Sequence, residues 1–247
     1  MDPMTPAPLD GKVAIVTGGS RGIGRAVAAA LVAQGASVTI TGLDQSHLDE
    51  ASRALSPAGR DRAGAIEAVV TDVRDFAAVE RMVARTVDRF GGIDYLVNNA
   101  GVGIFSHVAD MTPAQWAQTI DTNLTGVYNC CHAVIPHLRT RGAGYIINIS
   151  SLAGSNAFVG AAAYCASKAG LNAFSDALMQ ELRHQNIRVS CVAPGSVATS
   201  FSSGDASKGA DWKIAPSDVA EIVLDLIQMH PRSLPSRVEL RPSRPAK

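Results

Sequence analysis

Short runs of almost purely apolar residues alternate along the chain with longer segments in which apolar residues recur at helical spacing. Residues 13–16 (VAIV) and 146–149 (IINI) are examples of the short runs. Strands that are covered on both faces have this composition, and such strands form parallel sheets. The predicted strands are Lys12–Thr17, Ser37–Thr41, Ile66–Thr71, Asp94–Asn98, Tyr145–Ser150, Arg188–Val192 and Arg237–Leu240. The predicted helices are Gly22–Gln34, Ser46–Leu55, Phe76–Phe90, Pro113–Leu138, Ala161–Gln185 and Ser217–Met229.

This alternation predicts a single α/β domain, a doubly wound seven-stranded parallel sheet with helices on both faces. No repeat or internal linker interrupts it between residues 9 and 247. Residues 1–8 have no basic start and no apolar core, so we expect a flexible N-terminal tail rather than a signal peptide or an anchor. Residues 200–215 are polar and contain glycine, and they follow the sixth strand at the edge of the sheet where ligands bind. We predict that this segment is a substrate lid.

Composition excludes several classes of protein. Lysine plus arginine equals aspartate plus glutamate at 22 each, so no overall field attracts nucleic acid or an anionic membrane. No apolar run is long enough to span a bilayer. The 4 cysteines show no Cys-x-x-Cys spacing and no nearby histidine pairs, so we expect no metal site and reduced, packed thiols in a cytoplasmic protein.

The candidate chemistry begins with Tyr164 and Lys168, which lie four residues apart in a predicted helix. Residues at this spacing share a helix face, so a phenol and an ammonium lie side by side. A nearby cation favours the phenolate and lowers the pKa of a tyrosine toward the range of a general acid or base. The same pair alone also fits a packed tyrosine beside a lysine that reaches the surface, so the interpretation depends on the surrounding motifs.

Three further motifs follow strands at the same predicted edge of the sheet. Residues 17–24 (TGGSRGIG) follow the first strand and open a helix, where glycines allow a backbone to approach a pyrophosphate. Their spacing differs from the common Gly-x-Gly-x-x-Gly fingerprint. Asp72 and Val73 follow the third strand, and residues 98–101 (NNAG) end the fourth. Their coincidence at one edge predicts a dinucleotide site.

With these motifs the chain resembles the short-chain dehydrogenase/reductase family in its compact, single-domain Rossmann-like form, over residues 9–219. Asn123 in a helix, Ser151 thirteen residues before Tyr164, and Pro194-Gly195 followed by Thr199 complete the resemblance. The resemblance implies four catalytic residues: Asn123, Ser151, Tyr164 and Lys168. It implies that the cofactor is bound by Gly18, Ser20, Arg21, Gly22, Ile23, Gly24, Asp72, Val73, Asn99, Ala100, Gly101, Tyr164, Lys168, Pro194, Gly195, Val197 and Thr199.

The roles that the resemblance implies agree with the chemistry of the side chains. Tyr164 would give a proton to a carbonyl oxygen as hydride arrives, or remove it from an alcohol. Lys168 would hold the nicotinamide ribose and lower the tyrosine pKa. Ser151 would hydrogen-bond the reacting oxygen, and Asn123 would fix a water in a proton path. Without the resemblance, Ser151 is equally a strand-end hydrogen-bonding residue and Asn123 a helix-kinking one.

The choice of cofactor depends on the residues after the second strand. An acid there binds the ribose of NAD, whereas arginine accommodates the 2′-phosphate of NADP. Gly42 stands where NAD-preferring relatives carry the acid, and Leu43 stands where NADP-preferring relatives often carry arginine. Arg21 in the glycine turn is typical of NADP enzymes, and Asp44 opposes it. We expect NADP(H) to be favoured over NAD(H).

The substrate and the assembly are predicted only by class. The residues expected around the substrate are mostly apolar, and they are Ile104, Phe105, Leu152, Ala153, Phe158, Val159, Phe201 and Trp212. They favour a ketone, aldehyde or secondary alcohol with an apolar body. The glycine turn also resembles that of 3-oxoacyl thioester reductases, but residues 236–242 (SRVELRP) replace their usual ending. Helices of this family pair between subunits, so we expect a homotetramer or homodimer.

Two other functions remain open. One is a dinucleotide-sensing protein that has lost its chemistry, which usually shows changes at the serine, tyrosine or lysine that this chain retains. The other is an epimerase or dehydratase on the same fold, for which the chain lacks the usual extra substrate domain.

Overall fold

The structure is a computed structural model, and it describes residues 9–56, 64–201, 207 and 211–245. The predicted tail, residues 1–8, lies outside the described residues, as do positions 202–206 and 208–210 of the predicted lid. Within the described part, seven parallel strands form one sheet in the order β3-β2-β1-β4-β5-β6-β7. The strands are β1 (Val13–Val16), β2 (Ser37–Gly42), β3 (Ile66–Val70), β4 (Tyr95–Asn98), β5 (Gly144–Ile149), β6 (Ile187–Pro194) and β7 (Arg237–Leu240).

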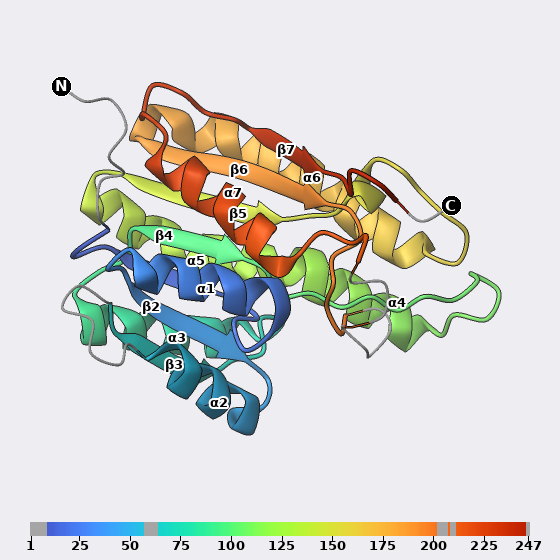
Figure 1. Cartoon of the computed structure of the whole chain (residues 1–247), viewed down its shortest axis with the longest axis horizontal. Coiled ribbons are helices and arrows are strands. Elements are labelled where there is room, and N and C mark those ends of the chain that lie inside the picture. Colours follow the sequence, from blue (N-terminus) through green and yellow to red (C-terminus); the bar gives the residue numbers. More distant parts are fainter. Residues whose placement is uncertain (1–8, 57–63, 202–206, 208–210, 246–247) are drawn as a thin grey trace.

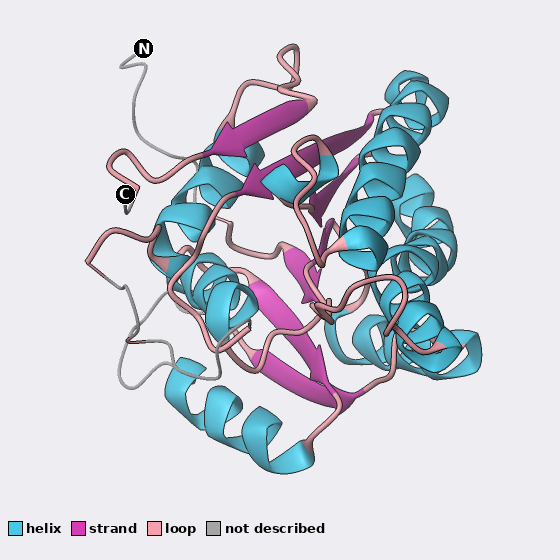
Figure 2. Cartoon of the chain, turned by 90° about the vertical axis from the view of Figure 1, so that its right-hand side faces the viewer, coloured by secondary structure: helices cyan, strands magenta, loops and turns pink. Residues whose placement is uncertain are grey.

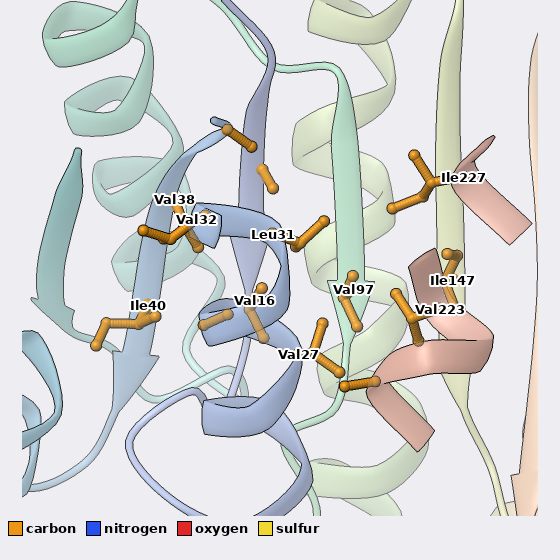
Figure 3. Close-up of a cluster of buried hydrophobic side chains, with 14 of the residues drawn as sticks. Val16, Val27, Leu31, Val32, Val38, Ile40, Val97, Ile147, Val223 and Ile227 are labelled. Carbon is orange, nitrogen blue, oxygen red and sulfur yellow. The ribbon is translucent and has the colours of Figure 1, made fainter. Parts of the chain in front are cut away.

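Helices cover both faces of this sheet, which confirms the predicted fold class (Figure 1). The α-helices are α1 (Gly22–Ala33), α2 (Gln45–Leu55), α3 (Phe76–Phe90), α4 (Pro113–Ile120), α5 (Gly126–Arg141), α6 (Ala162–Leu182) and α7 (Pro216–Gln228). One buried cluster lies between the sheet and α1, α2 and α7, and a second lies between the sheet and α3, α5 and α6. In the first cluster, Val27 and Leu31 of α1 and Val223 of α7 pack over Val16 and Val97 of the central strands (Figure 3).

The strand order places a ligand site at the centre of the sheet. The chain runs from β1 outward to β3 and then returns to β4 on the other side of β1. In such sheets the connections after the two central strands diverge, and the crevice between them is where ligands bind. Figure 2 looks at this carboxyl edge, where the loops that follow the strands gather.

The segment predicted as one helix over Pro113–Leu138 is interrupted in the structure. Residues Asp121–Thr125 form a π-helical turn between α4 and α5. Asn123 lies in this turn, and its side chain accepts a hydrogen bond from Val102 N (2.8 Å) and donates one to Val102 O (2.9 Å). The wider turn brings the asparagine to the loop after β4, a role typical of π-bulges at functional sites. The prediction of a regular helix was therefore wrong at this turn.

The segment predicted as a helix over Ala161–Gln185 ends earlier than expected. The α-helix stops at Leu182, and Arg183–Gln185 form a 3₁₀ turn. Asn186 follows with φ of 57°, a left-handed conformation that ends helices. The sixth strand then begins at Ile187 and continues to Pro194, beyond its predicted ends.

Candidate active site

The glycine turn between β1 and α1 has a backbone that only glycines allow. Gly18 and Gly22 have φ of 63° and 55°. A Cβ on Gly24 would lie 2.3 Å from Gly18 O and 2.5 Å from Asn99 Nδ2. Because glycine has no Cβ, α1 can pack closely against the turn and the loop after β4. A turn that binds a phosphate through its backbone needs this close packing.

The N-terminus of α1 has no side-chain cap. Arg21 is its N-cap residue and makes no side-chain capping bond. By contrast, Asp44, Asp75 and Thr112 cap α2, α3 and α4 with their side-chain oxygens. The first N–H groups of a helix need a partner, and a phosphate satisfies them. The residues present therefore fit the pyrophosphate of a dinucleotide.

Hydrogen bonds fix the end of β4 against the glycine turn. The backbone N–H groups of Asn99 and Ala100 both donate to Thr17 Oγ1, at 3.0 Å each. Asn99 Nδ2 donates to Thr17 O (2.9 Å) and Gly18 O (3.1 Å). The predicted motifs after β1 and β4 are thus one rigid unit. Thr17 is a member of this unit that the predicted set of binding residues did not include.

The predicted adenine-side residue Asp72 lies next to an arginine. Arg74 Nε donates to both carboxylate oxygens of Asp72 (2.9 and 3.0 Å), and Arg74 Nη2 donates to Oδ2 (2.6 Å). These hydrogen bonds lower the pKa of Asp72 below its ordinary value. Asn129 of α5 donates to Val73 O at 2.9 Å and so holds the same loop. Sequence reasoning missed both Arg74 and Asn129, although Arg74 follows Asp72 by only two residues.

Tyr164 and Lys168 lie in the first two turns of α6, facing the end of β5. Ser151, two residues after the end of β5, lies close enough to Tyr164 to oppose the rise in the pKa of its phenol. Lys168 is buried, and its Nζ donates to Ile149 O at 2.9 Å. Its Nζ lies 5.9 Å from the centroid of the Tyr164 ring. The structure therefore brings the predicted serine, tyrosine and lysine to one place.

Asn123 reaches the same place from the π-helical turn. Its Nδ2 donates to Ser167 Oγ at 3.0 Å, and Ser167 Oγ donates to Tyr164 O at 2.7 Å. A Cβ on Gly101 would lie 3.2 Å from Asn123 Oδ1 and 3.9 Å from Lys168 Nζ. Asn123 and Lys168 thus flank Gly101, and all four predicted catalytic residues are neighbours.

The pKa of Tyr164 differs from the sequence-based expectation. Burial raises it above its ordinary value, the hydrogen bond with Ser151 opposes the rise, and Cys165 adds to it. The expectation that Lys168 lowers this pKa was wrong for this structure, since Lys168 Nζ is directed to Ile149 O. Burial lowers the pKa of Lys168 itself to about 8. The arrangement thus holds a neutral phenol beside an ammonium that readily loses its proton.

Replacing Lys168 by Met is expected to change how stability depends on pH. The lysine has a lower pKa in the folded chain than in the unfolded chain, so its charge destabilises the fold below pH 8. This cost disappears as pH rises toward the ordinary lysine pKa of about 10.4, because the folded chain loses its proton first. Without added cofactor, Lys168→Met should raise the free energy of unfolding by about 2 kcal/mol at neutral pH, and by much less near pH 10. Urea unfolding of the wild type and the variant at both pH values measures this gain in the free energy of unfolding. A gain of the same size at the two pH values would contradict the lowered pKa of Lys168.

A comparison with known proteins identifies the family. The family model for the short-chain dehydrogenase matches residues 12–209. The chain belongs to the short-chain dehydrogenase family. It is therefore an oxidoreductase of a family that uses nicotinamide cofactors.

Related sequences and structures agree with this assignment. An uncharacterized oxidoreductase of Staphylococcus saprophyticus is 35% identical over 95% of this chain and 98% of its own. The 3-oxoacyl-(acyl-carrier-protein) reductase FabG of Chlamydia muridarum is 40% identical over 79% of this chain and 78% of its own. A metagenomic short-chain oxidoreductase solved in complex with NADP has a TM-score of 0.83 and 38% identity, covering 96% of this chain and 100% of that one.

In this short-chain dehydrogenase, the segment after β6 lies against the glycine turn. Gly195 N donates to Leu240 O (2.8 Å), and Ala198 N donates to Ile214 O (2.8 Å). A Cβ on Gly22 would lie 3.3 Å from Thr199 Cγ2. The predicted residues 194–199 thus lie with the other loops at the carboxyl edge of the sheet, and hydrogen bonds join them to Ile214.

The residues expected around the substrate divide into two groups. The rings of Phe105 and Phe201 contact Tyr164, and Phe158 contacts Phe105. The others are not gathered in this way. Ala153 packs with Ala161, Cys165 and Tyr164, and Leu152 lies beside Gly195. Ile104 is half-buried, Val159 is exposed, and Trp212 contacts Lys213.

The described residues also bear on two other kinds of site, a membrane span and a metal centre. In residues 9–56, 64–201, 207 and 211–245, no helix has the length and apolarity needed to cross a bilayer. The same residues hold no group of three or more histidine, cysteine, aspartate or glutamate side chains placed to bind a metal ion. The cysteines, Cys130, Cys131, Cys165 and Cys191, are buried free thiols.

Proposed function

We propose that this short-chain dehydrogenase/reductase transfers hydride between NADP(H) and a ketone or secondary alcohol, with Tyr164 as the general acid and base. The observation that carries the proposal is the phenol of Tyr164, which lies beside Ser151 and next to the buried ammonium of Lys168. A phenol with these neighbours can give its proton to an oxygen on which charge develops. The bound cofactor supplies the hydride.

The residues around the reacting oxygen have separate tasks. Tyr164 Oη delivers the proton in reduction and takes it back in oxidation. Ser151 Oγ donates a hydrogen bond to the same oxygen and orients it toward Tyr164. The Lys168 ammonium lies next to the phenol, and its pKa of about 8 lets it exchange protons near neutral pH. Asn123 holds the loop after β4 through Val102 and the helix of Tyr164 through Ser167.

The remaining predicted residues hold the cofactor in this proposal. Backbone N–H groups at Ser20, Arg21, Gly22, Ile23 and Gly24 meet the phosphates, and Gly18 allows their approach. Asp72 and Val73 contact the adenine, whereas Asn99, Ala100 and Gly101 line the ribose beside Lys168. Pro194, Gly195, Val197 and Thr199 hold the nicotinamide amide.

Exposed charges beside the glycine turn support a preference for NADP(H). Arg21 is exposed at the start of α1, and Ser20 Oγ would lie 3.2 Å from a Cβ on Gly42 at the end of β2. Asp44 is engaged by Ser46 Oγ (2.5 Å) and His47 N (2.9 Å) as the cap of α2. An occupied Asp44 competes poorly for ribose hydroxyls, and Arg21 is left to bind a 2′-phosphate.

Arg21→Ala is therefore expected to lower kcat/KM for NADPH by about tenfold and to leave kcat/KM for NADH within about twofold. Arg25→Ala is the matched control, because Arg25 is also exposed on α1 but faces Glu50 at 3.7 Å. Steady-state kinetics with both cofactors measure the effect. An equal loss for the two cofactors in Arg21→Ala would contradict a phosphate contact.

The substrate assignment has two candidates within this function. The apolar rings beside Tyr164 favour a simple ketone or alcohol, and the 40% identity to FabG of Chlamydia muridarum favours a 3-oxoacyl thioester. Oxidation of NADPH with a panel of ketones and 3-oxoacyl thioesters tests the function and separates the two. A protein that binds NADPH and reduces nothing in the panel would instead fit the silent dinucleotide sensor.

The assembly and the location are proposed on family grounds. We expect a homotetramer or homodimer that works in the cytoplasm. Light scattering on the purified full chain measures the assembly.

A further inference from the structure

The Tyr164 ring is surrounded by other aromatic rings on the side where a substrate would lie. Phe105 meets it edge to face, with centroids 5.6 Å apart and planes at 68°. Phe201 lies 6.0 Å from it at 53°, and Phe158 lies 5.9 Å from Phe105. These four residues, Phe105, Phe158, Tyr164 and Phe201, are called the aromatic cluster below. They come from α6 and from three different loops at the carboxyl edge.

The phenylalanines of the aromatic cluster are unusually exposed for their type. Their exposed fractions are 42% for Phe105, 53% for Phe158 and 44% for Phe201. Large apolar side chains that meet at a surface and remain in water gain free energy when a ligand covers them. Their position over a proposed proton donor makes a substrate the natural occupant.

The loops that carry the rings are fixed to one another. Gly103 lets the rings of Phe105 and Phe201 lie close to the backbone, since a Cβ at this position would lie 2.7 Å from Phe201 Cε1 and 3.1 Å from Phe105 Cε2. Ser106 N donates to Gly160 O at 2.8 Å, which joins the Phe105 loop to the Phe158 loop. The ring positions are therefore set before a ligand arrives, and a preorganised surface selects shape more sharply than a mobile one.

The chemistry of the cluster favours a flat aromatic group over a chain or a charge. Phenyl rings attract another ring through edge-to-face and offset contacts that an alkyl group cannot make. The ammonium of Lys168 is buried, and it donates its hydrogen bond to Ile149 O. The aromatic cluster thus offers a charged substrate tail no partner of its own.

We propose that the substrate is a ketone that carries an aromatic ring close to its carbonyl group, or the matching secondary alcohol, whose ring packs among Phe105, Phe158 and Phe201 while its oxygen meets Tyr164 and Ser151. This inference rests on the proposed function. It names the substrate class and assigns Phe105 and Phe201 as the residues that select it.

Phenylacetone and cyclohexylacetone form the decisive pair of substrates. Both carry a six-membered ring one methylene from the carbonyl, and the carbonyl is unconjugated in each. The wild-type chain should reduce phenylacetone with a kcat/KM about fivefold to tenfold above that for cyclohexylacetone. In Phe105→Leu and in Phe201→Leu this ratio should fall to within about twofold of unity, because leucine keeps the apolar surface and removes the ring.

Phe90→Leu is the matched control, since Phe90 ends α3 at the opposite edge of the sheet. The ratio of kcat/KM for phenylacetone to that for cyclohexylacetone in this variant should equal the wild-type ratio. Calorimetric titration of both ketones into the wild-type chain with oxidised cofactor, a complex that cannot react, should give a Kd for phenylacetone that is lower than that for cyclohexylacetone by the same factor. A wild-type ratio near one, or a ratio that survives in both cluster variants, overturns the inference. Failure of the proposed function has a different signature, because then no carbonyl compound consumes NADPH.

Discussion

Tyr164→Phe is expected to lose turnover by at least about two orders of magnitude while its Kd for NADPH changes less than about threefold. The substitution removes only the hydroxyl beside Ser151, and the ring keeps its neighbours Phe105 and Phe201. A role in proton transfer therefore appears in kcat, whereas a merely structural role would appear in stability and in cofactor affinity.

The measurement combines steady-state kinetics with a fluorescence titration of NADPH. Tyr128→Phe is the matched control, because Tyr128 is half-exposed on α5 and contacts His132 rather than the site. It should behave like the wild type. Full activity in Tyr164→Phe would remove Tyr164 from the mechanism.

Gly24→Ala is expected to destroy cofactor binding and to weaken the fold. The new methyl group would lie 2.3 Å from Gly18 O, so either the turn or α1 must move. Overpacking of this kind typically costs about 1–3 kcal/mol of stability. The displaced backbone no longer cradles the phosphates, so the Kd for NADPH should rise by more than about tenfold.

Thermal unfolding and NADPH titration measure the two effects of Gly24→Ala. Gly91→Ala is its control: Gly91 ends α3 with φ of 80° and has no atom within 4 Å of the added methyl group. That variant should lose about 1 kcal/mol through backbone strain and keep its affinity for NADPH. Tight NADPH binding by Gly24→Ala would show that the turn does not hold the phosphates.

The pattern of the sequence predicted most of the fold because each element carries its own local signal. Apolar runs such as residues 13–16 mark buried parallel strands, and glycine or polar residues mark the ends that face a ligand. The parallel arrangement then requires that motifs after β1, β3, β4 and β5 meet at one edge. The grouping of Gly18, Asn99, Ser151 and Tyr164 was predictable on this ground alone.

The features that sequence reasoning missed depend on contacts between distant residues. The π-helical turn forms around two hydrogen bonds between Asn123 and Val102, which lie 21 residues apart in the chain. The raised pKa of Tyr164 follows from burial, and Phe105 and Phe201, two of its neighbours, come from separate loops. The spacing of residues along the chain predicts neither the π-helical turn nor the surroundings of Tyr164, since both depend on how the loops pack in the folded chain.

The central claim is that the carbonyl group receives hydride from the cofactor and a proton at Tyr164. Reduction of the best ketone of the panel by NADPH that carries deuterium at the transferred position of its nicotinamide tests it most directly. The account predicts that the alcohol carries deuterium on its carbinol carbon, and that Tyr164→Phe forms almost none of this product. An alcohol without deuterium, or equal labelled product from Tyr164→Phe, would contradict it.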